Sequence, residues 1–227
     1  QTLNVADWSE TVSVGLTGRP SVLFDGTTYH MWHGSSTSLS HSTSASAVFA
    51  SPSTAVASFS GGTPAELETV TVIKETDGFK MIAYGATTKE FALYTSNDGT
   101  NWTKDAAVFS GADLPAGWQK LDAPFLLKDG ESYKLYFQVK EVDGKYQIYL
   151  ATSATIGGTY TLANSNSPVL TPESGETRVF HPTVVKDGSQ YYMWYATQDQ
   201  LKLGLAKSTD GITWVKSLAN PIVDVDV

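Results

Sequence analysis

The chain reads His181-Pro182-Thr183-Val184-Val185-Lys186-Asp187-Gly188 at the clearest of four repeated stretches, which continues into Tyr191-Tyr192-Met193-Trp194-Tyr195. Each copy contains a short apolar run, an Asp-Gly pair and a second run rich in aromatic residues. An Asp-Gly pair between alternating apolar segments is a strong hairpin signal, because glycine accepts the left-handed backbone of a tight turn. Every copy is therefore predicted to contain a β-hairpin.

The four copies are regularly spaced along the chain. Their turn glycines are Gly26, Gly78, Gly130 and Gly188, which gives steps of 52, 52 and 58 residues. Periods of this length indicate supersecondary units that stack and share a core. Two further alternating runs follow each hairpin, so each unit is expected to hold four strands. The predicted fold is an all-β propeller of four-stranded blades, with four or five blades in the ring.

A single propeller domain is predicted for residues 1–227. Its four units are expected at 19–60, 66–110, 120–170 and 179–223. The strands of the first unit are expected at 20–24, 28–33, 36–42 and 46–50. No stretch keeps an apolar period of 3.6 residues over three turns, so no amphipathic helix is expected.

Residues 1–15 precede the first unit and are predicted to form an extra outer or closing strand. Trp8–Val14 resembles Trp102–Val108, the expected outer strand of the second unit. A four-bladed ring with an extra strand and a five-bladed ring lacking most of one blade both fit this pattern. The missing strands could also come from a neighbouring chain or a longer parent protein. The third alternative predicts strand exchange or assembly through residues 1–15.

The last turn of two units has a sequence of its own, Ser96–Trp102 in one and Ser208–Trp214 in the other. Asp-Gly supplies the left-handed position of this turn, and a tryptophan can pack between adjacent sheets. We interpret the motif as a folding device. Trp102 and Trp214 are both predicted to be largely buried.

Composition excludes several classes of partner. The net charge is −8, and Lys and Arg together number only 15, so no basic cluster is available to neutralise the phosphates of a nucleic acid. The longest apolar runs are about five residues, too short to cross a bilayer. The acidic balance weakly disfavours anionic polysaccharides.

No cofactor or metal is expected. The chain has no glycine-rich phosphate loop, no serine nucleophile elbow and no zinc-spaced histidine pair. His30, His33 and His41 are interpreted as strand-face residues. Abundant Ser, Thr, Asn and Tyr are typical of an extracellular or cell-surface protein, and a start at Gln1 fits either a mature secreted chain or a trimmed one.

The repeat resembles that of known enzymes. The run Pro182–Ala196, together with Leu203–Trp214, is similar to the blades of the five-bladed propeller glycosidases. This clan contains glycoside hydrolase families 43 and 32 and the related family 130. The resemblance covers roughly residues 19 to 217. It implies carboxylic acids at the starts of innermost strands, where one protonates the leaving oxygen and, in inverting members, another activates water.

The family 43 pattern resembles two Asp-Pro pairs and one Glu-(Gly/Ala)-Pro, and this chain departs from it. Arg19 and His181 stand where an Asp-Pro acid would be expected. Ala123 stands there in the third unit, and Asp122 precedes it. Glu68 aligns with Asp122. The resemblance implies Asp122 as general acid, Glu68 as the opposing carboxylate, and Arg19 and His181 as substrate-binding residues, all at one mouth of the channel.

Each of these residues also has a purely structural interpretation. Asp122 could be a turn residue and Glu68 a solvated acid, with Arg19 and His181 paired to them. Two functions follow. The first is a secreted, glycoside hydrolase-like propeller that acts on or binds a neutral glycan. The second is a non-catalytic module for adhesion or extracellular assembly. The replaced Asp-Pro acids favour the second, and the blade sequence favours the first.

Overall fold

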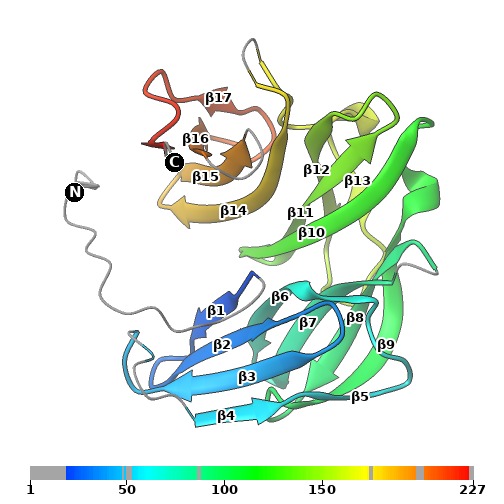
Figure 1. Ribbon diagram of the computed structural model, residues 1–227, viewed down its shortest axis with the longest axis vertical. Helices are drawn as coiled ribbons and strands as arrows, with labels where there is room; N and C mark the ends of the chain where they lie inside the picture. Colours follow the sequence, from blue (N-terminus) through cyan, green and yellow to red (C-terminus); the bar gives the residue numbers. More distant parts are fainter. Residues whose placement is uncertain are drawn as a thin grey trace.

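The computed structural model describes residues 19–47, 49, 53–85, 88–173, 176–197 and 202–224. These residues form four sheets arranged as a β-propeller, which confirms the predicted all-β class (Figure 1). The helical turns among them are two 3-10 segments of three residues each, Gly111–Asp113 and Asn164–Asn166.

Each sheet is one blade, and its strands follow one another in chain order. Blade 1 consists of β1 (Ser21–Phe24), β2 (Tyr29–Gly34), β3 (Leu39–Ser44) and β4 (Ser53–Val56). Blade 2 consists of β6 (Glu66–Glu75), β7 (Gly78–Gly85), β8 (Glu90–Ser96) and β9 (Asn101–Ser110). Blade 3 consists of β10 (Trp118–Asp129), β11 (Ser132–Glu141), β12 (Tyr146–Ser153) and β13 (Thr161–Leu162). Blade 4 consists of β14 (Val179–Asp187), β15 (Gln190–Thr197), β16 (Lys202–Ser208) and β17 (Val215–Lys216).

Two short strands supplement these blades. β5 (Ser58–Ser60) pairs in parallel with β9, and β18 (Val223–Asp224) pairs with β16. The first strands of the four blades, β1, β6, β10 and β14, line a central cavity of about 440 Å³. The blades are therefore arranged around a channel, as the repeat predicts.

The Asp-Gly pair forms the turn between the first and second strand of every blade. Gly26, Gly78, Gly130 and Gly188 have φ values of 102°, 117°, 64° and 58°. Residues with a side chain rarely adopt this left-handed region, whereas glycine enters it without a steric penalty. The four turns occupy equivalent places, so the register of the sequence repeat is confirmed.

The second strand of an inner blade buries both of its faces. Successive side chains of a strand point to opposite sides of the sheet. On β11, Tyr136 contributes to the core shared by blades 3 and 4, and Phe137 contributes to the core shared by blades 2 and 3. Both side chains have no exposed surface. A blade of this kind needs a neighbour on each side.

Three hydrophobic clusters fill three of the seams between blades, joining blade 1 to 2, 2 to 3 and 3 to 4. Among the described residues, no such cluster joins blade 4 to blade 1. Val22 and Phe24, on the face of β1 away from blade 2, are 55% and 50% exposed. Val185, on the face of β14 away from blade 3, is 47% exposed. In the described part of the chain the fourth seam is open (Figure 1).

The Ser-x-Asp-Gly motif is a compact turn that also receives a hydrogen bond from the preceding blade. In blade 4, Asp210 Oδ1 accepts from the N–H groups of Ile212 and Thr213 at 2.7 Å each. The turn leaves the carbonyl of Gly211 pointing outward, and Tyr136 Oη donates to it at 2.7 Å. The predicted role as a folding device is thus explained by a contact across the seam.

The motif in blade 2 works in the same way. Asp98 Oδ1 accepts from the N–H groups of Thr100 and Asn101 at 2.8 and 2.7 Å. Here Trp32 Nε1 of blade 1 donates to the carbonyl of Gly99 at 2.7 Å. Both motifs therefore fasten a blade to its predecessor through a buried aromatic side chain.

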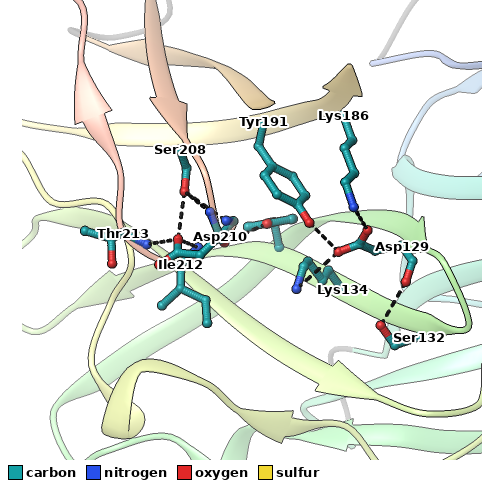
Figure 2. A network of polar contacts seen from close by, with 11 residues as sticks. Asp129, Ser132, Lys134, Lys186, Tyr191, Ser208, Asp210, Ile212 and Thr213 are labelled. Atoms are coloured by element: carbon teal, nitrogen blue, oxygen red, sulfur yellow. Dashed lines mark hydrogen bonds and ion pairs between the residues drawn. The ribbon is translucent and has the colours of Figure 1, made fainter. Parts of the chain in front are cut away.

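An ionic cluster on Asp129 adds to the seam between blades 3 and 4 (Figure 2). Asp129, in the first turn of blade 3, accepts hydrogen bonds from Tyr191 Oη and Lys186 Nζ of blade 4. Lys134 Nζ lies 3.4 Å from the same carboxylate. These partners lower the pKa of Asp129 against the opposing effect of burial, so the carboxylate is ionised at neutral pH.

One strand prediction for blade 1 is wrong. The sequence predicted the fourth strand at 46–50, whereas the structure has it at Ser53–Val56. Ala45 to Ala47 form a bend, and Phe49 has a φ of 49°, a left-handed value incompatible with an extended strand. The buried Phe49 suggested a strand residue but is a loop anchor. The closing strand predicted for residues 1–15 lies outside the described residues.

Burial of the two motif tryptophans differs from the prediction. Trp102 is 1% exposed, as expected, but Trp214 is only half-buried at the edge of the core between blades 3 and 4. Trp102 lies on β9, which is flanked by β8 and the added strand β5, whereas Trp214 precedes the two-residue strand β17.

We predict unequal costs for truncating these two side chains. Trp102→Ala should lower the free energy of unfolding by about 3–5 kcal/mol, and Trp214→Ala by about 1–2 kcal/mol, because less apolar surface is lost. Urea unfolding followed by far-UV circular dichroism measures both. Equal losses for the two variants would contradict the difference in burial.

Candidate functional site

The inner strands of blades 2, 3 and 4 are irregular near one mouth of the channel. The pairing register shifts between Glu66 and Thr71, between Asp122 and Phe125, and between Phe180 and Thr183. A bulge bends its strand and redirects side chains, and bulges are common beside functional sites. The candidate site is therefore built where the strands leave regular pairing.

Two bulges share an unusual backbone conformation. Ala123 has a φ of 48° and His181 has a φ of 53°, at aligned positions of blades 3 and 4. Both precede a proline, and a left-handed conformation is strained for a residue that is not glycine. The same backbone conformation thus presents a different side chain in blades 3 and 4.

A cavity of about 170 Å³ lies at this mouth. Its lining residues are Arg19, Glu68, Lys120, Asp122, Gln138, Tyr146, Arg178, Phe180 and His181. The structure brings together all four residues singled out from the sequence. Their roles as acid, opposing carboxylate and substrate-binding residues stay predictions.

Asp122 is a buried carboxylate, 4% exposed, with several donors around it. Oδ1 accepts from Thr69 Oγ1 at 2.8 Å and from the N–H of Ala123 at 2.6 Å. Oδ2 lies 3.0 Å from Lys120 Nζ and 3.4 Å from Gln138 Nε2. Burial alone would raise the pKa of Asp122, but the charge and hydrogen bonds of these donors hold it below its ordinary value. At neutral pH the group is ionised.

Glu66 is a second carboxyl on the same ammonium, and sequence reasoning missed it. Its Oε1 lies 3.2 Å from Lys120 Nζ, while Oε2 is buried without a hydrogen-bond partner among the described residues. Burial and then the negative charge of Asp122 raise the pKa of Glu66 above its ordinary value. Lys120 therefore contacts one ionised carboxylate, Asp122, which lines the cavity, and one carboxyl with a raised pKa, Glu66, which lies beside the cavity and does not line it.

Glu68 occupies the mouth without being deeply buried. Its side chain is half-buried, and its main-chain oxygen accepts from the N–H of Arg19 at 3.0 Å. This bond joins the start of blade 1 to the inner strand of blade 2. Glu68 is thus both a lining residue and part of the seam between these blades.

His181 is neutral at physiological pH. Burial, followed by the positive charge of Arg19, lowers its pKa to about 3. The main-chain N–H of His181 donates to Gln138 Oε1 at 3.0 Å. The buried ring atom Nδ1 has no hydrogen-bond partner among the described residues. A neutral imidazole can bind a hydroxyl group but cannot supply a positive charge.

Aromatic and guanidinium groups form the remaining wall. The Arg178 guanidinium lies 5.3 Å from the centre of the Tyr146 ring, and Phe180 lies 5.7 Å from Tyr146 and 4.6 Å from His181. Lys120, Tyr146 and Arg178 were not singled out from the sequence. Arg178 precedes the fourth unit, and Lys120 and Tyr146 lie in the third unit outside the motif that all four units share, so the alignment gave no signal for them.

In the described ranges, from residue 19 to 224 with their gaps, no group of three or more His, Asp or Glu side chains is placed to hold a metal ion. In the same residues, no helix has the length and apolarity required to cross a membrane. His30, His33 and His41 lie on strand faces of blade 1, as interpreted from the sequence.

Comparisons with known proteins agree on the fold. No protein-family model and no curated protein matches the sequence. A thermostable family-43 glycoside hydrolase superposes with a TM-score of 0.70 at 18% identity, over 91% of this chain and 73% of that one. The α-L-arabinofuranosidase of Podospora anserina gives 0.68 at 13% identity, over 95% and 73%. The family 32 β-fructofuranosidase of Bombyx mori gives 0.62 at 11% identity, over 89% and 48%.

These similarities establish a fold shared with the propeller glycoside hydrolases, which confirms the resemblance of the blades. Sequence identities of 11–18% support a shared fold and do not by themselves indicate a shared activity. The described part of this chain contains four blades.

The pKa of His181 predicts a pH dependence of stability. The folded protein protonates His181 only below about pH 3, whereas the unfolded chain does so below its ordinary value of 6.5. Unfolding therefore takes up a proton between these pH values, and stability falls on acidification through this window. His181→Asn, which tolerates the left-handed backbone, should remove roughly 3 kcal/mol of the loss between pH 7 and pH 4.

Thermal and urea unfolding at pH 4, 5, 6 and 7 measure this effect. His41, whose pKa burial lowers to about 4, remains in the variant and keeps its own contribution, so the slope should shrink without vanishing. Parallel curves for the two proteins would show that His181 does not titrate as described.

Proposed function

We propose that this chain is a glycan-binding propeller of the glycoside hydrolase type, with the mouth cavity as its binding site. The observation that carries the proposal is the polar cavity itself. It gathers charged, amide and aromatic side chains from the starts of all four blades and from β11 and β12, on a fold shared with proteins that act on sugars. Sugars are bound by polar groups that fix their hydroxyls and by rings that cover their apolar faces.

The environment of Asp122 favours binding over hydrolysis. A general acid must hold a proton at the working pH, and enzymes raise its pKa to that end. Asp122 is instead held ionised by Lys120, Thr69 and the N–H of Ala123. Its carboxylate is also occupied by these donors. The prediction that Asp122 is the acid thus requires a rearrangement of the site.

A glycosidase remains the second candidate, and Glu66 is the observation that favours it. A carboxyl with a raised pKa next to an ionised carboxylate is the electrostatic pattern of a general acid and its partner. Both carboxyls share Lys120, so substrate binding would have to separate them. In this candidate, Glu66 replaces Asp122 as the proton donor.

We also propose that the protein works outside the cell, at a cell surface or in the extracellular space. Support comes from its high content of Ser, Thr and Tyr and from its net charge of −8. Glycans long enough to reach across a propeller mouth are concentrated there. Adhesion and extracellular assembly are compatible with such a module.

Turnover assays separate the two candidates. The wild-type protein should release no nitrophenol from nitrophenyl arabinosides, xylosides or mannosides, while affinity electrophoresis detects binding to a glycan. Glu66→Gln and Asp122→Asn should then change binding only. Turnover by the wild type that either substitution abolishes, in a variant with unchanged circular dichroism, would establish the hydrolase instead.

Assembly through residues 1–15 is a separate proposal. It is supported by the likeness of Trp8–Val14 to β9 and by the apolar side chains exposed at the open seam, Val22, Phe24 and Val185. Deleting residues 1–15 should lower the melting temperature or change the oligomeric state measured by light scattering. Unchanged stability and mass would overturn the proposal.

A further inference from the structure

Each of the three filled seams contains a turn acid that contacts the following blade. Glu75 of blade 2 accepts hydrogen bonds from Lys128 Nζ at 2.6 Å and from Tyr133 Oη at 2.9 Å, both of blade 3. Asp129 of blade 3 accepts in the same way from a lysine and a tyrosine of blade 4 (Figure 2). Asp25 Oδ2 of blade 1 lies 3.7 Å from a lysine Nζ of blade 2. An acid of each blade thus pairs with a lysine of the next blade.

Asp187 is the corresponding acid of blade 4. It ends β14 as Asp129 ends β10, and its exposed carboxylate has no partner among the described residues. Blade 1 does not offer the matching lysine. The residue just before the turn acid is a lysine in blades 2, 3 and 4 and a phenylalanine in blade 1, at Lys74, Lys128, Lys186 and Phe24. An ion pair on Asp187 therefore requires a blade of a different kind from blade 1.

A second contact repeats between blades and involves a donor on the second strand. Trp32 and Tyr136 hold the same place in blades 1 and 3, and each donates to the glycine carbonyl of the Ser-x-Asp-Gly turn of the next blade. Ile82 holds this place in blade 2 and offers no donor. The corresponding turn of blade 3, at 153–158, contains no Asp-Gly pair. Donor and turn are thus present together in two seams and absent together in the third.

Trp194 holds the same place in blade 4. It pairs with Thr183 on the first strand, as Tyr136 pairs with Phe125 in blade 3. Trp194 is half-buried, and its Nε1 has no hydrogen-bond partner within the described part of the chain. The corresponding turn of blade 1, at 44–47, contains no Asp-Gly pair. Blade 1 therefore lacks the acceptor that the donor of blade 4 matches.

The end face of blade 4 surrounds these two groups with apolar side chains. We define it by Val185, Asp187, Tyr192, Trp194 and Leu205. Tyr192 and Trp194 alternate along β15 with buried residues that pack against blade 3, so they point the other way. Their rings stack at 6.3 Å, Leu205 lies opposite Trp194, and Val185 is 47% exposed. The end face thus has the composition of a seam that lacks its second half.

We propose that the end face binds a partner blade of the same repeat, distinct from the four described blades. The partner blade has a lysine just before its turn acid, which pairs with Asp187, and a Ser-x-Asp-Gly turn, whose glycine carbonyl accepts from Trp194 Nε1. Blade 1 lacks both features, whether in this copy or in a second one. Residues 1–15 contain no lysine and no Asp-Gly pair, so they could add an outer strand but not these contacts. The end face lies outside the mouth cavity, so this proposal is independent of the proposed glycan site.

A lengthened chain tests the match. A second copy of residues 163–224, joined after Val227, supplies a probe blade, because this range contains Lys186 and the turn Ser208–Trp214. Scanning calorimetry compares its melting temperature with that of the native chain. The extension should raise the melting temperature by about 5 °C or more, because a fourth filled seam buries the apolar side chains of the end face.

Variants of the receiving face assign the gain to the two contacts. Trp194→Phe keeps an aromatic ring but loses the donor, and Asp187→Asn loses the charge. In the extended chain each should lower the melting temperature by roughly 2–4 °C, the effect of one net hydrogen bond. In the native chain each should change it by less than about 1 °C, because neither group has a partner there. Asp113→Asn, an exposed acid between β9 and β10, is the matched control and should change neither chain.

Each result decides for or against the proposal. An extended chain that melts no higher than the native chain overturns it, and this comparison stands even if a variant fails to fold. Equal losses in both chains for Trp194→Phe and Asp187→Asn show roles within blade 4 and also overturn it. Light scattering that finds a native dimer dissociated by Trp194→Phe assigns the end face to a second copy instead. A shift of the Trp194 indole N–H resonance on deletion of residues 1–15 assigns it to that segment and overturns the proposal too.

Discussion

Burial of both faces of the two inner sheets is the constraint on which this structure depends. A blade whose strands carry apolar side chains on alternate sides is stabilised by a neighbour on each side, since each exposed face costs the free energy of its apolar surface. Tyr136 and Phe137 show this on one strand, where adjacent residues belong to different cores. The Ser-x-Asp-Gly turns fix which blades are neighbours, because the glycine carbonyl of each turn accepts a hydrogen bond from an aromatic side chain of the preceding blade.

The mouth of the channel follows from this arrangement. Stacking the blades brings equivalent positions of the inner strands to one annulus, and the bulges then direct different side chains into it. There the Lys120 ammonium contacts the carboxyl groups of both Asp122 and Glu66. The pKa of Asp122 is lowered, so Asp122 is ionised at neutral pH, whereas the pKa of Glu66 is raised. Removing one partner from such a buried group would leave an uncompensated charge. The charges of these three residues are thus bound up with the stability of the inner strands that carry them.

Local signals explain what could be predicted from the sequence. An Asp-Gly pair determines the conformation of a turn of four residues, so it can be recognised from local sequence. The repetition of this pair indicated the number of units and the alignment of their strands. The fourth strand of blade 1 was misplaced because Phe49 is buried yet adopts a left-handed backbone, and hydrophobicity alone does not distinguish a loop anchor from a strand residue. The convergence of Arg19, Glu68, Asp122 and His181 followed from ring symmetry. Glu66, Lys120 and Arg178 could not be found, since their contacts arise only after bulges shift the strands.

The open seam between blades 1 and 4 gives the described part of the molecule the energetics of a linear array. In a closed ring every blade has two interfaces, whereas here the terminal blades have one each and the inner blades have two. Stability in such an array is a sum of unit and nearest-neighbour terms, so opening begins at the ends and moves inward. Amide hydrogens of β7 and β11 would accordingly exchange last, and those of β2 and β15 first. The channel mouth spans all four blades, so ligand held there links the two ends that fray most easily.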